Sequence, residues 1–72
     1  MLKPLPYREV KRKLEAAGFE VASQRSSHVK FVKRTEEGTF TAIVPHHKEI
    51  GLGTLRSILR QAGISPEEFE QL

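Results

Sequence analysis

The spacing of apolar residues changes along this chain from a helical period to strand alternation and back, and that change limits the fold more than any other feature. Apolar side chains near the start lie three or four residues apart, at Tyr7, Val10, Leu14 and Ala17. This spacing predicts a helix from about Pro6 or Tyr7 to Ala17, which Gly18 ends. A similar stripe predicts a second helix over Thr54–Ala62, and a capping pattern opens a short third helix at Ser65–Glu68.

Between the helices the sequence alternates in the manner of β-strands. The predicted strands are Phe19–Ala22, Val29–Lys33 and Thr39–Val44. The expected connections are Gln24–Ser27, a hairpin turn at Thr35–Gly38, and a loop from His46 to Gly53. Short connections favour antiparallel pairing. We therefore expect an α+β fold of order α-β-β-β-α, a three-stranded antiparallel sheet with two helices on one face, plus a short C-terminal helix.

Length and composition narrow the class of protein. Seventy-two residues suit a single domain over residues 1–72 with a small core. There is no cysteine, so no disulfide or thiolate metal site is expected. No apolar run approaches the ~20 residues of a membrane helix, and the start lacks the apolar stretch of a signal peptide. We expect a soluble cytoplasmic domain that does not contact a membrane.

The charge is distributed unevenly. Residues 1–63 hold all twelve Lys and Arg with six Glu, whereas residues 64–72 hold three Glu and no basic residue. A basic body favours a polyanionic partner, with nucleic acid first among the candidates. The alternative is that a net charge of +3 serves only to keep a small protein soluble.

Strand alternation also predicts a candidate active face. If Val29 and Phe31 face the helices, then His28, Lys30, Val32 and Arg34 face the other way. An imidazole beside cations suits cleavage of RNA, whose own 2′-OH is the nucleophile. Histidine ordinarily titrates near pH ~6.5 and can take or give a proton, while lysine and arginine stabilise the charge on phosphorus. The alternative is that His28 is only a polar residue on a solvated face.

Other chemistry has weaker support. His46 and His47 together with His28 would give three metal ligands, but adjacent histidines in extended chain point apart, and no Asp or Cys is present to help. Gly51–Thr54 precedes a helix but lacks the ending of a phosphate-binding loop. Without Asp there is no Ser-His-Asp set. We therefore expect no metal and no small-molecule cofactor.

Three segments carry a resemblance to a known family. They are Ser26–Phe31, the strand end Val44–His46, and the long helical stretch Gly53–Ser65. Together these segments resemble the HicA family of bacterial toxins, small ribonucleases that cleave messenger RNA, over about Tyr7 to Ser65. One departure is that Ser26 stands where the family pattern has glycine, a residue suited to a positive φ.

The resemblance implies a fold like the double-stranded-RNA-binding domain, a catalytic His28, and a HicB-like antitoxin that covers the active face. In this interpretation Arg25 and Lys30 bind or neutralise the phosphate and Ser27 supports the loop. Arg34 and His46 are further candidate RNA contacts.

Two rival functions remain open at this stage. The first is a binding module without catalysis, which recognises RNA through phosphate and 2′-OH contacts and needs no histidine. The second is a protein-interaction subunit that presents Val32 and Ile43 on an otherwise polar sheet face. The second rival is compatible with a toxin that its partner inhibits by covering that face.

Overall fold

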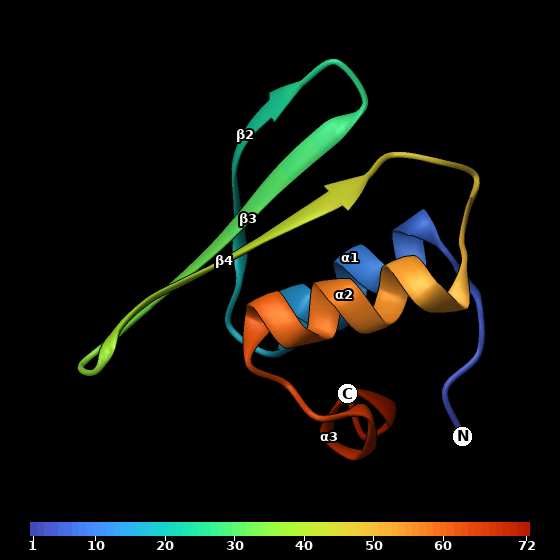
Figure 1. The fold of residues 1–72 in the computed structure, drawn as a ribbon. Helices are drawn as coiled ribbons and strands as arrows, with labels where there is room; N and C mark the ends of the chain where they lie inside the picture. The colour runs from blue at the N-terminus through green and yellow to red at the C-terminus, as the bar shows by residue number, and fades with distance from the viewer.

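The computed structural model describes residues 1–72 and confirms the predicted order of the main elements, with two short strands added (Figure 1). The elements in chain order are β1 (Leu5–Pro6), α1 (Tyr7–Ala16), β2 (Glu20–Arg25), β3 (His28–Thr35), β4 (Gly38–Pro45), β5 (Glu49–Ile50), α2 (Leu52–Ala62) and α3 (Pro66–Glu70). Strands β2, β3 and β4 form one antiparallel sheet in chain order. Both long helices pack on one face of it, as expected.

The first helix forms where the apolar stripe predicts it. Pro6 is its N-cap residue, and Val10 and Leu14 are its buried side chains. Gly18 follows the helix with a φ of 101°, a left-handed conformation that glycine adopts without steric cost. The chain then turns, and Phe19 enters the core just before β2.

The second strand is longer than the alternation predicts. Gln24 and Arg25, expected in a connection, are the last two residues of β2, and only Ser26 and Ser27 form the turn. The prediction failed because β2 lies at the sheet edge with all six residues exposed, so no apolar alternation marks its second half. As a result, Arg25 is directly paired with His28.

The predicted loop from His46 to Gly53 also contains an element that periodicity missed. Glu49 and Ile50 form β5, which pairs with β1 at Leu5 and Pro6. A strand of two residues is too short to show an alternation of apolar and polar residues. Helix α2 then begins at Leu52 rather than Thr54, with Gly51 as its N-cap residue.

The two long helices and the sheet enclose one core. Its residues are all apolar: Val10, Leu14, Phe19, Val29, Phe31, Ala42, Val44, Ile50, Leu55, Ile58, Leu59, Ala62 and Phe69. The last of these belongs to α3, whose start has the predicted capping box between Ser65 and Glu68. No polar or charged side chain is buried, so chemistry must occur at the surface. None of the helices combines the length and apolar character needed to cross a membrane.

Candidate functional site

The end of the sheet where β2 turns into β3 brings Arg25, His28 and Pro45 into one row. His28 is paired with Arg25 on one side and with Pro45 on the other. Directly paired residues of antiparallel strands share a face, with Cβ atoms roughly 4.5–5.5 Å apart. The Arg25 guanidinium and the His28 imidazole therefore start from neighbouring points on one face, and both residues are exposed.

Lys30 extends this row along the same face. It lies two residues after His28, about 7 Å further along the strand, and is exposed beside Ser23 and Ile43. A lysine side chain can span that separation, so Lys30 and Arg25 can reach one phosphate held at His28. Arg34 points to the same face but lies six residues from His28, about 20 Å away. The structure therefore does not bring Arg34 to the same group.

The apolar residues of this face differ from each other in exposure. Val32 is only 7% exposed, because it sits on the central strand between its paired neighbours Glu20 and Thr41. It therefore offers little contact area to a partner, contrary to the expectation for a protein-interaction surface. Ile43, on the edge strand β4, is 38% exposed and remains available.

The turn before His28 contains one residue with a strained backbone conformation. Ser26 has a φ of 57° and is the chain's one residue other than glycine with a positive φ. The Gln24 side-chain amide donates to the Ser26 carbonyl oxygen at 3.3 Å. A positive φ at the first of two loop residues, and not at the second, is the pattern of a type II′ turn, which prefers glycine there. A glycine at this position would adopt the same backbone conformation without steric cost.

Ser27 links this turn to the end of β4. Its carbonyl oxygen accepts a hydrogen bond from the backbone N–H of His46, and its side chain is half-buried. Because His46 directly follows Pro45, it lies close to the row formed by Arg25, His28 and Pro45. Its ring, however, turns toward the helices and stacks on Tyr7, with ring centroids 4.0 Å apart and an angle of 29° between the planes. The structure thus brings His46 to the same end of the sheet as His28 but not to the same face.

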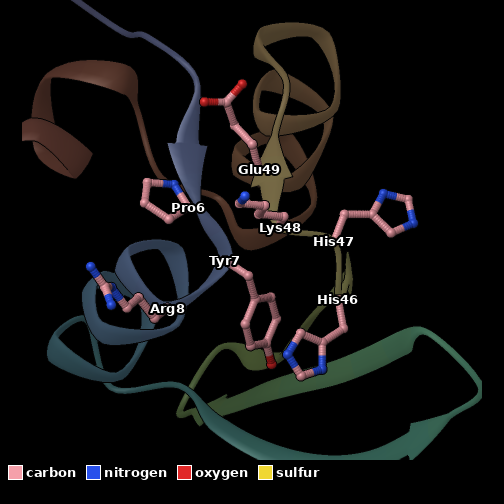
Figure 2. A pocket seen from close by; sticks show the side chains of 7 residues that line it. All are labelled: Pro6, Tyr7, Arg8, His46, His47, Lys48 and Glu49. Carbon is pink, nitrogen blue, oxygen red and sulfur yellow. The ribbon is translucent and has the colours of Figure 1, made fainter.

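The largest cleft of the molecule lies beside this stack (Figure 2), and not over His28. It has a volume of about 820 Å³ and is lined by Pro6, Tyr7, Arg8, His46, His47, Lys48 and Glu49. Figure 2 shows the Tyr7 and His46 rings next to each other, with Arg8 and His47 directed away from them on opposite sides. Burial raises the pKa of the Tyr7 hydroxyl, with a smaller contribution from the Glu15 carboxylate. The hydroxyl therefore stays protonated in neutral solution.

The cations near His28 are free of ion pairs. The chain's ion pairs lie elsewhere, between Arg12 and Glu9 at 2.9 Å and between the amino terminus and Glu70. The hydrogen bond from Arg12 holds the pKa of the exposed Glu9 carboxyl below its ordinary value. Arg25 and Lys30 have no such partner, so their charge is available to an anionic ligand.

Metal binding has no support in the arrangement of side chains. No group of three or more His, Cys, Asp or Glu residues lies close enough together to hold a metal ion. The three histidines considered from the sequence do not form such a group.

Sequence reasoning missed the contribution of Tyr7. The helical stripe assigned this residue to the apolar face of α1, and it does pack against the core. Its contact with His46 depends on the loop between β4 and β5. Neither the spacing nor the type of these two residues indicated that they would meet.

The chain was compared with models of known protein families. A model described as the HicA toxin of bacterial toxin–antitoxin systems matches residues 7–64 of the 72-residue chain. The match spans α1, the whole sheet and α2. A comparison with curated proteins found no match.

Proposed function

This chain belongs to the HicA toxin family, and we propose that it is a metal-independent endoribonuclease that cleaves messenger RNA with His28 as its catalytic residue. The observation that carries the proposal is the row at the end of the sheet. An exposed imidazole stands there beside an exposed guanidinium, and an unpaired ammonium lies two residues further on the same face.

The chemistry follows from what RNA supplies. The 2′-OH attacks the neighbouring phosphorus atom, the 2′-O–P bond forms and the P–O5′ bond breaks, which leaves a 2′,3′-cyclic phosphate and a 5′-hydroxyl. One proton must leave the 2′-oxygen and one must reach the 5′-oxygen. His28 performs one of these transfers, as general base or as general acid.

The neighbouring residues serve the charge that develops on phosphorus. Arg25 and Lys30 contact the non-bridging oxygens, where fixed positive charge stabilises the transition state more than the ground state. Ser27 supports the turn that presents His28, through its backbone bond to His46. Arg34, about 20 Å further along the strand, contacts the RNA backbone away from the cleaved bond.

The partner that this function implies is a HicB-like antitoxin that covers the His28 face and shares the cytoplasm with the messenger RNA. Ile43 supports this part of the proposal. It is exposed at 38% and directly paired with Lys30, so a protein that masks Lys30 also gains an apolar contact.

The test is cleavage of a labelled single-stranded RNA in the presence of EDTA. We expect the wild type to cut, and His28→Ala to lose about 10²–10⁴-fold in rate, as for removal of a general acid or base. Glu36→Ala, a change at an exposed residue of the β3–β4 turn at the far end of the sheet, is the matched control and should cut normally.

Two other outcomes would count against the proposal. Cleavage by folded His28→Ala at the wild-type rate would remove His28 from the mechanism. Binding of RNA by both proteins without any product would favour the non-catalytic binding module.

A further inference from the structure

We propose that the stacked rings of Tyr7 and His46 form a binding site for one nucleobase of single-stranded RNA, next to the scissile phosphate that lies beside His28. This inference rests on the proposed function and adds to it a position at which the enzyme holds its substrate. It also gives His46 a role different from the phosphate contact expected from the sequence.

The stacked rings of Tyr7 and His46 form a surface on which a third aromatic ring can stack. Tyr7 packs against the hydrophobic core, and its ring is stacked on the imidazole of His46. Tyr7 is half-buried whereas His46 is exposed, so the imidazole is the more accessible ring of the pair. Stacking on aromatic side chains is how proteins hold unpaired bases, and it tolerates any base because each has a π-face.

The loop that carries His46 is fixed at both ends, so the ring is held in place before any ligand binds. At the start of the loop, His46 donates its backbone N–H to the Ser27 carbonyl oxygen. At its end, Glu49 pairs with Pro6 in the β1–β5 ladder, directly before Tyr7. A ring held in this way loses little conformational entropy when a ligand stacks on it.

The surrounding charge suits a nucleotide better than an apolar ligand. The cleft beside the stack is lined by the cations Arg8 and Lys48 and by one carboxylate, Glu49. Lys48 can neutralise the phosphate attached to a stacked base, whereas the Arg8 side chain is directed away from the stack (Figure 2). The volume of about 820 Å³ falls within the ~300–1,000 Å³ usual for ligand sites. An RNA duplex would not fit this role, because its bases are already stacked on each other.

The position of the site relates it to the scissile bond. His46 directly follows Pro45, and Pro45 is paired with His28. The two imidazoles therefore come from backbone positions next to each other but serve opposite sides of the sheet end. An RNA strand that wraps around this end places a phosphate at His28 and a neighbouring base on His46.

The experiment measures base stacking without cleavage. His28→Ala protein is titrated into short RNAs that each carry a single 2-aminopurine, whose fluorescence falls when the base stacks, at successive positions around the cleaved bond. We expect quenching at one position. Adding His46→Ala should abolish the quenching and weaken RNA binding about 5- to 150-fold, the range for loss of one stacked base.

Matched variants separate stacking from other effects. His46→Phe keeps an aromatic ring and should keep both the quenching and most of the affinity. Glu36→Ala changes an exposed residue of the β3–β4 turn, which does not line the cleft, and should change neither. Thermal melting of each variant by circular dichroism verifies that it is folded.

The results distinguish this inference from the proposed function. If protein with His28 intact cleaves RNA but His46→Ala neither changes the quenching nor weakens binding by more than twofold, the base site is wrong and the ribonuclease stands. Quenching that depends on a ring at position 46, in a protein that never cleaves RNA, would support the base site and refute the ribonuclease. Equal losses in His46→Phe and His46→Ala would show that His46 acts by some property other than its aromatic face and would overturn the inference.

Discussion

Replacing Ser26 by glycine should stabilise the protein, because this residue has a positive φ of 57° in the turn that presents His28. A side chain in the left-handed region costs roughly 1–2 kcal/mol, which glycine avoids. Glycine also makes the unfolded chain more flexible, which lowers stability by roughly 0.4–1 kcal/mol. The difference predicts a net gain of about 0.5–1 kcal/mol. For a domain of this size that gain raises Tm by about 3–6 °C.

The assay is thermal and urea unfolding followed by circular dichroism at 222 nm, with the urea m value unchanged because the exposed surface is the same. The matched control is Ser27→Gly, the identical change one residue later where φ is not positive. It should lower stability by about 0.4–1 kcal/mol, since only the gain in unfolded-state flexibility applies. If the two variants shift Tm in the same direction, the explanation from backbone strain is wrong.

Three further outcomes are expected. Gly63→Ala should destabilise the protein by more than ~1 kcal/mol in urea unfolding, because Gly63 has a φ of 70° and an added Cβ would lie 2.8 Å from Cε1 of Phe40; wild-type stability would contradict this. Phe69→Ala should cost about 3–5 kcal/mol and leave the domain largely unfolded at 37 °C, since Phe69 is 1% exposed and links α3 to the core; a cooperative melt within a few degrees of wild type would show that α3 is dispensable. Lys30→Ala should weaken RNA binding and lower the steepness of the plot of log K against log salt concentration by about 0.7, as for loss of one phosphate contact on a single strand. The control Arg60→Ala removes the same charge from an exposed site on α2 and should keep the wild-type slope. Equal slopes for Lys30→Ala and wild type would show that Lys30 does not contact the RNA.

Much of the candidate active face was predictable because it depends on local rules. Alternation along β3 placed His28, Lys30 and Arg34 on the face opposite Val29 and Phe31, and the structure confirms it. The pairing of Arg25 with His28 was not predictable in the same way. The exposed half of β2 carries no pattern, and its length follows from hydrogen bonds to β3 rather than from its own residues.

The partial burial of Val32 marks the limit of such reasoning. Alternation correctly assigned it to the outer face, but a residue on a central strand has neighbours on both sides. Its exposure depends on how those side chains cover it, and the pattern of one strand holds no such information.

The sequence by itself determined the helices and the alternating faces of β3 and β4, because each of these depends on residues a few positions apart. Only the tertiary structure decided that Tyr7 meets His46. That contact requires Leu5 and Pro6 to pair with Ile50 and Glu49, although α1 and the three-stranded sheet lie between these pairs in the sequence. It also requires the hydrogen bond from the His46 backbone N–H to the Ser27 carbonyl oxygen. Such contacts join segments that are far apart in the sequence and share no pattern of apolar and polar residues. They form only when the packed core brings those segments together.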